Sequence, residues 1–477
     1  LTTPNITTNS VDLEWDEESP STATDGYEVV IMASGDDPDT QNPVATAVPV
    51  TGLTSTVSGL SSGTSYDAYV RSVCDANATP PEVSDWSTVE SFRTLPDFCV
   101  GDNFYDNGGP DGDYLVDSDE VTTISPDNAG DVITVDFLSF NVESGWDGLL
   151  IYDGPDTSAP LIDSGGSGFN NAPDGSWTGS GTDNTTDPFS AEGETFVSTH
   201  PSGALTFRFV SDGSIVEAGW EANVTCGPAP TTNVQIIHNS ADPAASSVDI
   251  YLDGALLPEL TGVSFRQASA FLEAPAFVDV TVDVVPAGAD LSASVYTETF
   301  NLAEDEDYII VADGVIDPSQ FDGQVNTIDF SLEVFAGAQQ SSTNAGETSV
   351  LVHHGSTDAP TVDVRETSVP AGILVDDISY TEFQGYLELA TQDYTLDVEL
   401  GDNSGVVASF EANLQTLGLA DSAITVVASG FLDPAVNQSG EAFGLFAALP
   451  SGGALVPLPD ITVGTDAFTA NNFNYYP

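Results

Sequence analysis

The stretch 278–285 reads VDVTVDVV, and its alternation of apolar and polar residues decides the fold class of the chain. A period of two places the apolar side chains on one face of a β-strand. Similar runs recur about every 8–12 residues, separated by Gly, Pro, Asn and Asp. Examples are 27–32 (YEVVIM), 131–138 (DVITVDFL) and 424–428 (ITVVA). Amphipathic helical patterns are absent over any useful length, so we predict an all-β chain of sandwiches.

The charge balance excludes several classes of function. The chain has 477 residues, with 75 Asp and Glu against five basic residues, all of them arginine, and a formal net charge of −70. Nucleic-acid binding and docking on an anionic membrane both need clustered Lys and Arg, so we exclude both. The sequence has no run of about 18 apolar residues, so we expect no membrane insertion. This acidity indicates a saline or calcium-rich extracellular medium, where counterions screen the repulsion.

Composition breaks divide the chain into segments. They fall near 95–98 (LPDF), 227–231 (GPAPT) and 338–348 (AQQSSTNAGET). Polar, Pro-rich and Gly-rich breaks of this kind are typical of domain boundaries. We therefore predict four β-sandwiches in series, forming an elongated rod, followed by an extended tail or linker. The predicted segments are 1–95, 97–227, 229–345, 348–458 and the tail 459–477.

The third and fourth segments carry an internal repeat. NVQIIHNSADP from 233 matches SVLVHHGSTDAP from 349, an offset of 116 residues. VSFRQASAFLEAP from 263 matches ISYTEFQGYLELA from 378, an offset of 115. YIIVADGVIDP from 308 matches ITVVASGFLDP from 424, again an offset of 116. Three matches in the same order at a nearly constant offset predict two copies of one domain. Their openings resemble a family of tandem, Ig-like β-sandwich domains of unknown function in secreted bacterial proteins.

The first segment contains Leu60-Ser-Ser-Gly-Thr-Ser-Tyr66, followed by the alternating run DAYVRSV. Together with Trp15 in VDLEW, this resembles fibronectin type III domains. The resemblance implies a corner of the sandwich where the Tyr66 hydroxyl bonds back to the backbone. It also implies a role as a spacer or binding module. Because Leu1 lies so close to Trp15, we expect the first strand to be barely present. Cys74 is then either free or paired outside this sequence.

The second segment contains FLSFNVESGWDGLLIYDG at 137–154 and LTFRFVSDGSIVEAGWEANVTC at 205–226. Both motifs, in this order, resemble the CUB family of jelly-roll β-sandwiches. Some members bind calcium through carboxylates in loops between strands. Hard oxygen ligands from separate loops suit calcium, which tolerates loose geometry.

The same resemblance implies which residues of this chain bind calcium. They are Glu143, Asp147 and Asp212, with the backbone carbonyl of Ser214 as a further ligand. The alternative is that these are solvated loop carboxylates in an acid-rich chain.

The CUB resemblance also bears on the cysteines. Cys99 and Cys226 lie at the two ends of the segment, and the internal cysteines of the family are missing. We therefore expect Cys99 and Cys226 to form a disulfide that ties the ends together, as an oxidising compartment favours. A free, buried pair is the alternative.

Two histidines in the repeat, His238 and His354, invite a metal or catalytic interpretation. Only four histidines exist in the chain, so a histidine-rich metal site is disfavoured. We predict instead strand-end histidines hydrogen-bonded to turn aspartates such as Asp242 or Asp358.

No catalytic residues are predicted. The sequence has no Gly-x-Ser-x-Gly elbow, no HExxH and no CxxC motif. No segment remains for a catalytic domain once the four sandwiches are assigned. We therefore expect a non-enzymatic protein.

The expected role is that of a secreted or cell-surface bacterial structural protein, such as a filament or stalk subunit. Strand exchange through the tail and calcium binding would stabilise the assembly. The expected partners are further copies of the chain or other domains of a longer chain. Two alternatives stay open. One is an adhesin or a module that binds a surface glycan or protein, with Trp146 and Trp177 as stacking residues. The other is the accessory region of a secreted enzyme.

Overall fold

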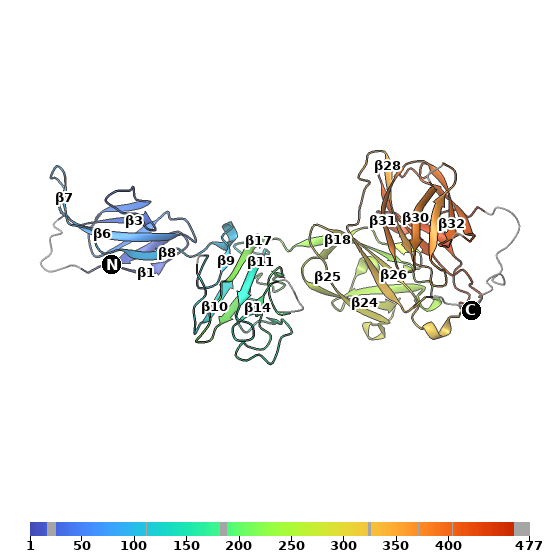
Figure 1. Ribbon diagram of the computed structural model, residues 1–477, viewed down its shortest axis with the longest axis horizontal. Helices are drawn as coiled ribbons and strands as arrows, with labels where there is room; N and C mark the ends of the chain where they lie inside the picture. Colours follow the sequence, from blue (N-terminus) through green and yellow to red (C-terminus); the bar gives the residue numbers. More distant parts are fainter. Residues whose placement is uncertain are drawn as a thin grey trace. The chain divides into compact units, whose positions relative to one another are not determined.

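The structure is a computed structural model that describes residues 1–16, 25–110, 112–181, 188–322, 326–369, 372–402 and 404–461, without the side chains of 48 and 49. Every regular element in these ranges is a β-strand or a short 3-10 helix, so the predicted all-β class is confirmed (Figure 1). None of the helices in the described ranges has the length and apolarity to cross a membrane. The chain divides into two compact units, Leu1–Ala229 and Pro230–Pro477.

The first sandwich, residues 1–95, packs two sheets around one core. Their strand orders are β1–β2–β5 and β4–β3–β6–β7, with β8 also paired to β6. Leu13 and Ile31, from opposite sheets, are fully buried between them. The strands are β1 (Thr2–Ile6), β2 (Ser10–Glu14), β3 (Tyr27–Ala33), β4 (Ala45–Val50), β5 (Thr54–Ser58), β6 (Ser65–Asp75), β7 (Glu82–Val83) and β8 (Glu90–Arg93).

The first strand of this sandwich differs from the prediction. β1 has five residues and pairs with β2, and Leu1 packs against the core. Room for it exists because a tight turn joins the two strands, with the Thr7 N–H donating to the Ser10 carbonyl at 2.9 Å. Beside this turn, the Tyr66 hydroxyl accepts the backbone N–H of Ser61 at 3.0 Å, and the Leu60 N–H donates to the Asn9 carbonyl at 3.0 Å.

The second sandwich, residues 97–227, also has two facing sheets. Their orders are β10–β16–β12–β13 and β14–β11–β17–β9, with β15 paired to β11. Aromatic rings dominate the core, where Phe137, Phe140 and Phe207 are buried. The strands are β9 (Phe104–Tyr105), β10 (Asp119–Ile124), β11 (Val132–Val142), β12 (Gly148–Asp153), β13 (Leu161–Ile162), β14 (Gly179–Ser180), β15 (Thr195–Val197), β16 (Leu205–Val210) and β17 (Gly219–Gly227).

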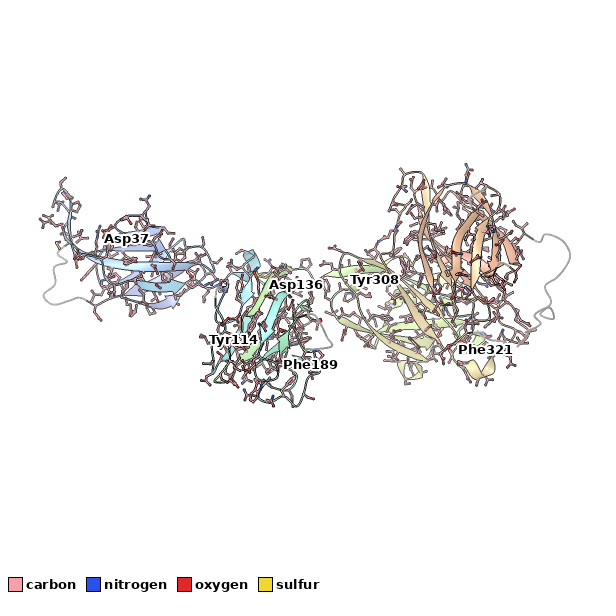
Figure 2. All side chains as sticks on the ribbon, in the orientation of Figure 1. Asp37, Tyr114, Asp136, Phe189, Tyr308 and Phe321 are labelled. Carbon is pink, nitrogen blue, oxygen red and sulfur yellow. A yellow bond between two sulfur atoms is a disulfide. The ribbon has the colours of Figure 1, made fainter. Side chains whose placement is uncertain are left out.

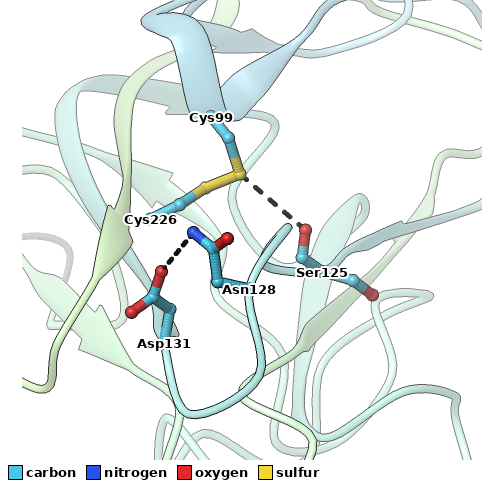
Figure 3. Close-up of a disulfide and its surroundings, with 5 residues drawn as sticks. All are labelled: Cys99, Ser125, Asn128, Asp131 and Cys226. Atoms are coloured by element: carbon cyan, nitrogen blue, oxygen red, sulfur yellow. Dashed lines mark hydrogen bonds between the residues drawn. A yellow bond between two sulfur atoms is a disulfide. The ribbon is translucent and has the colours of Figure 1, made fainter.

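A disulfide links the two ends of the second sandwich. Cys99, in the 3-10 helix η1 (Phe98–Val100), is bonded to Cys226 on β17 (Figure 3). The neighbouring loop brings the Ser125 carbonyl oxygen to 3.9 Å from Cys99 Sγ. Within that loop, Asn128 Nδ2 donates to Asp131 Oδ2 at 2.9 Å. The bond therefore closes nearly the whole segment into one covalent loop.

The second unit contains the same pairing pattern twice. In the third sandwich, residues 229–345, β18 pairs in parallel with β26, and β19, β24 and β25 form the facing sheet. In the fourth, residues 348–458, β28 pairs in parallel with β34, and β29, β32 and β33 form the facing sheet.

The strand bounds of this unit follow in chain order. In the third sandwich they are β18 (Thr231–His238), β19 (Ser247–Leu252), β20 (Ala255–Leu256), β21 (Val263–Ser264), β22 (Gln267–Ala268), β23 (Leu272–Pro275), β24 (Asp279–Pro286), β25 (Tyr296–Asn301), β26 (Asp307–Asp313) and β27 (Ser331–Ala336). After it come β28 (Glu347–His354), β29 (Val362–Glu366), β30 (Gly372–Ile378), β31 (Phe383–Ala390), β32 (Asp393–Leu400), β33 (Val406–Asn413), β34 (Ala423–Ser429), β35 (Gly444–Ala448), β36 (Gly453–Ala454) and β37 (Val456–Pro457).

The third and fourth sandwiches share an apolar interface. Ile237 and Val311 of the third and Leu351 and Val427 of the fourth are fully buried in one cluster. In addition, β36 of the fourth sandwich pairs with β22 of the third. The two sandwiches therefore form a single compact unit.

The predicted tail begins inside the fourth sandwich. The Glu411 N–H donates to the Pro459 carbonyl, and the Ile461 N–H donates to the Ser409 carbonyl, both at 2.9 Å. Residues up to 461 therefore belong to the fold, three beyond the predicted end at 458. The remainder of the predicted tail, 462–477, lies outside the described residues, as does the strand exchange expected of it.

Candidate functional site

Three carboxylates converge at one end of the second sandwich. Glu143 follows β11, Asp147 precedes β12, and Asp212 comes shortly after β16. One carboxylate oxygen from each lies within 4.8 Å of the others. Because β12 and β16 are paired neighbours, the loops at this end bring the three side chains together.

Hydrogen bonds hold Asp147 at the centre of this cluster. Asp147 is fully buried, with an exposed fraction of 0%. Its Oδ2 accepts the hydroxyl of Tyr114 at 2.7 Å, and its Oδ1 accepts the backbone N–H of Asp212 at 2.7 Å. The Tyr114 hydroxyl in turn accepts the N–H of Glu143 at 3.1 Å. Tyr114, labelled in Figure 2, therefore connects two members of the cluster.

The other two carboxylates have different surroundings. Glu143 Oε2 is buried and has no hydrogen-bond partner. Asp212 Oδ1 accepts the backbone N–H of Ser214 at 2.8 Å and its hydroxyl at 3.2 Å. The side chain and N–H of Ser214 therefore orient Asp212. An unpartnered buried carboxylate oxygen beside two other carboxylates is a site that favours a cation.

The electrostatics of the cluster also favour a bound cation. Burial, followed by the charges of Asp147, Asp212 and Glu217, raises the pKa of Glu143. Burial also raises the pKa of Asp147, although its hydrogen bonds oppose that effect. None of the ion pairs among the described residues involves this cluster. Within the part of the chain that the structure describes, no basic side chain pairs with these carboxylates and offsets their negative charge.

This arrangement has the chemistry of a hard-cation site. Calcium takes about 6–8 oxygen ligands with flexible geometry, and carboxylates supply several of them. Glu143, Asp147 and Asp212 fit that donor set, since all offer oxygen and none offers sulfur or nitrogen.

Sequence reasoning missed two residues of this site. Tyr114 lies in a segment without a recognisable motif, far from the three acids in the chain. Glu217 adds negative charge near Glu143. For Tyr114 we find no signal in the sequence, because only the folded chain brings it to the cluster. Glu217 lies in the same stretch as Asp212, within 205–226, so that motif could have pointed to it.

The two histidines of the repeat are buried but do not bond the predicted aspartates. His238 Nε2 contacts the Ala245 carbonyl at 2.6 Å, and His354 Nε2 contacts the Pro360 carbonyl at 3.1 Å. Asp242 and Asp358 instead accept backbone N–H groups, including those of Ala244 and Leu432 respectively. Their carboxylates are thus already used to hold turns.

Burial lowers the pKa of both His238 and His354. This favours neutral imidazoles, each bonded to a backbone carbonyl. Both rings therefore have the character of structural groups.

A different histidine forms a fully buried contact with a carboxylate in the second unit. His353 Nε2 lies 2.5 Å from Asp313 Oδ2, and both side chains are fully buried. Asn239 Nδ2 donates to the other oxygen of Asp313 at 2.7 Å. This pair joins the third sandwich to the fourth.

The repeat itself carried a signal for this pair. Shifting by 116 residues places Ile237 opposite His353 and Asp313 opposite Ser429. Both members of the pair therefore depart from the repeat together.

The two candidate stacking tryptophans differ in accessibility. Trp177 is half-buried, and its ring centroid lies 5.0 Å from that of Phe196 in the core. It is therefore unsuited to stacking on a sugar. Trp146 is 41% exposed and immediately precedes Asp147.

Comparisons with known proteins find one family model and a number of solved structures that are similar to parts of the chain. The model of a domain of unknown function, DUF4397, matches residues 232–365, which span most of the third sandwich and the first strands of the fourth. No curated protein matches the chain. Among solved structures, the CUB1-EGF-CUB2 domain of human MASP-1/3 is similar with 12% sequence identity and a TM-score of 0.21. That match covers 64% of this chain and 95% of the other.

Proposed function

We propose that this chain is a non-enzymatic, extracellular structural protein of the bacterial cell surface. Its function would be to build a filament or stalk from β-sandwich modules stabilised by calcium. The observation that carries the calcium part is the cluster of Glu143, Asp147 and Asp212. It combines a fully buried carboxylate, an unpartnered buried carboxylate oxygen and no basic partner among the described ion pairs.

The module assignments belong to the same proposal. We assign the first sandwich as fibronectin type III-like, which the hydrogen bond from Ser61 N–H to the Tyr66 hydroxyl supports. We assign the second as CUB-like. The third and fourth are assigned as two copies of one domain, which their repeated parallel pairing supports. The fibronectin type III assignment of the first sandwich is what supports a spacer or binding role, since the third and fourth match a domain type of unknown function.

A bound calcium would offset the local charge and fix three loops at once. Loops in sandwich modules are otherwise the least stable parts of the fold. With a net charge of −70, assembly of many copies also requires cations to screen the repulsion between subunits. Calcium binding at the site and general screening of the net charge are different effects. They can be separated because sodium screens the charge without occupying a calcium site.

Isothermal titration of the calcium-free protein tests the local site. We expect one calcium equivalent that disappears in Asp147→Asn, while Asp136→Asn, an acid on β11 outside the cluster, is the matched control. Equal binding by Asp147→Asn and wild type would remove the site from the proposal. Electron microscopy with calcium and after chelation tests the assembly. Regular filaments that fray on chelation support it, and single particles under both conditions contradict it.

A second candidate function is ligand binding at the same end of the second sandwich. Trp146 and Ile215, which adjoin Asp147 and Ser214 in the chain, are 41% and 60% exposed. Exposed apolar side chains that gather into one patch with a polar rim mark recognition surfaces. An array of glycans and surface proteins, probed in calcium with wild type and Trp146→Ala, distinguishes an adhesin from a purely structural module.

A further inference from the structure

The core of the fourth sandwich encloses an apolar cavity of about 170 Å³. It lies between the sheet that contains β28 and β34 and the sheet that contains β29, β32 and β33. Its walls include Val364, Val375, Leu396, Val398, Val426 and Leu445. Protein interiors are normally packed to the density of organic crystals, with few voids larger than a water molecule. A cavity of this size in a small sandwich core is therefore unusual.

The third sandwich supplies an internal reference for this cavity. It has the same strand pairing, and its corresponding core cavity is only about 30 Å³. The difference in cavity volume between the two sandwiches is therefore not explained by their shared strand pairing. It must come from the side chains that differ between the two cores.

The strand register identifies those side chains. In the third sandwich, Val280 is paired with Phe300, whereas in the fourth Tyr394 is paired with Ala412. These pairs are equivalent because each stands next to an Asp–Asn pair at the start of its ladder, Asp279 with Asn301 and Asp393 with Asn413. Phe300 lines the small cavity and Ala412 lines the large one.

Aromatic and small residues are also exchanged at other positions of these two ladders. Tyr296, paired with Val284, corresponds to Ala408, paired with Val398. Tyr394 does not refill the space, because its hydroxyl is held by the Ala390 carbonyl at 2.7 Å. On the same strand Phe410, which is buried in the fourth core, stands where the third sandwich has Glu298, so Ala412 is the cavity-lining position at which the fourth sandwich lacks a ring.

Apart from the buried His353 and His354 on β28, the polar and exposed lining residues are gathered in two neighbouring segments. Glu411 and Thr416 belong to the end of β33 and the turn after it, while Pro457 and Pro459 belong to β37 and the residue range just beyond it. The Glu411 N–H donates to the Pro459 carbonyl, so these segments lie side by side. The cavity thus approaches solvent at this edge, and a carboxylate stands beside the approach.

We propose that the fourth sandwich binds a compact, neutral hydrocarbon group in this cavity. An apolar cavity of about 150 Å³ stays dry and admits benzene or xenon. A cavity of about 170 Å³ therefore suits a ring or short chain of about six carbons. The ligand is neutral because Glu411 and the net charge of −70 disfavour a carboxylate at the approach. This inference is independent of the calcium proposal.

Fluorine NMR of fluorobenzene with the full chain tests the inference directly. We expect one bound equivalent per chain in the wild type. Ala412→Phe, which restores the ring of the third sandwich, should reduce that binding by at least tenfold. Hexanoate at the same concentration should bind more weakly than fluorobenzene. Absence of saturable fluorobenzene binding, or equal binding by Ala412→Phe and wild type, overturns the proposal.

A second variant, Phe300→Ala, tests the same inference even if Ala412→Phe does not fold. Phe300→Ala removes the corresponding ring from the third sandwich and should create a second binding equivalent while leaving the first in place. Unchanged stoichiometry in a folded Phe300→Ala contradicts the assignment of the rings as the cause. If Ala412→Phe fails to fold, the stoichiometry of Phe300→Ala decides the question. Benzene-dependent thermal unfolding gives a second readout, because a ligand that binds only the folded state raises the melting temperature.

Discussion

Asp147 and Asp313 are both fully buried, yet the protein treats their charges in opposite ways. Asp313, between the third and fourth sandwiches, faces His353 at 2.5 Å and accepts a hydrogen bond from Asn239. Asp147, in the second sandwich, faces two further carboxylates and is not in any ion pair among the described residues. A buried carboxylate needs a partner, since removing a charge from water costs several kcal/mol. The chain supplies that partner for Asp313, and a cation from the medium would supply it for Asp147.

The largest expected effect comes from breaking the Asp313 pair on one side. His353→Ile places the residue of the third sandwich at this position and leaves Asp313 buried beside Asn239 alone. Losing one partner of a buried pair costs about 3–5 kcal/mol, so we expect the second unit to lose about that much stability. Hydrogen exchange of the amides in β26 and β28 measures the loss.

A double variant controls for the shape of the new side chain. Asp313→Ser with His353→Ile copies the other half of the repeat at both positions. We expect it to recover most of the stability, because an uncompensated charge is no longer buried. If the double variant is as unstable as His353→Ile alone, packing and not charge explains the first result.

Supplying the missing partner of Asp147 should have the next largest effect. Calcium at about 100 times its dissociation constant stabilises the folded state by about 2.7 kcal/mol. We expect the thermal transition of the second sandwich to rise accordingly in wild type and to stay unchanged in Asp147→Asn. Calorimetry with calcium and with a chelator measures this shift. A similar rise in Asp147→Asn would assign the stabilisation to general screening of charge.

Removing the hydroxyl that holds Asp147 should have a smaller effect. Tyr114→Phe keeps the buried ring but removes the hydrogen bond to Asp147 and the acceptor for the Glu143 N–H. A hydrogen bond to a charged group contributes about 1.5–3 kcal/mol, so we expect weaker calcium affinity by about tenfold or more. Titration calorimetry measures it. Unchanged affinity would show that the loops position Asp147 without Tyr114.

The smallest effect is a pH dependence of the calcium-free second sandwich. The pKa values of Glu143 and Asp147 are raised on folding, so the folded state binds protons more tightly than the unfolded state. The stability of the calcium-free second sandwich therefore falls as the pH rises from the ordinary carboxyl pKa through the raised pKa values of Glu143 and Asp147. We expect this slope to be smaller in Asp147→Asn. Melting temperatures in chelator between about pH 4 and 7 compare the two proteins. If the stability of the wild type and that of Asp147→Asn change with pH to the same extent, the prediction is wrong.

The two carboxylates also differ in how far sequence could predict their surroundings. Recognisable motifs contain Glu143, Asp147 and Asp212, so the sequence predicts that these three acids lie together. Tyr114 belongs to no motif. The His353–Asp313 pair was not expected, because its members lie on different sandwiches and adjacent His354 fits the repeat better. Likewise, the short stretch before Trp15 predicts almost no first strand, and this prediction is wrong. The number of residues alone does not show that a tight turn at Thr7 leaves room for β1.

The all-β class and the repeated strand pattern of the second unit could both be predicted from the amino-acid sequence. Alternating apolar residues and turn residues act over a few neighbours, and such local preferences are written directly in the chain. The pairing of the buried charges and the filling of each core could be seen only in the folded chain. Those outcomes depend on side chains that are distant in sequence, such as Asp313 and His353. They also depend on small volume differences such as Phe300 against Ala412, whose consequence appears only when two sheets close around them.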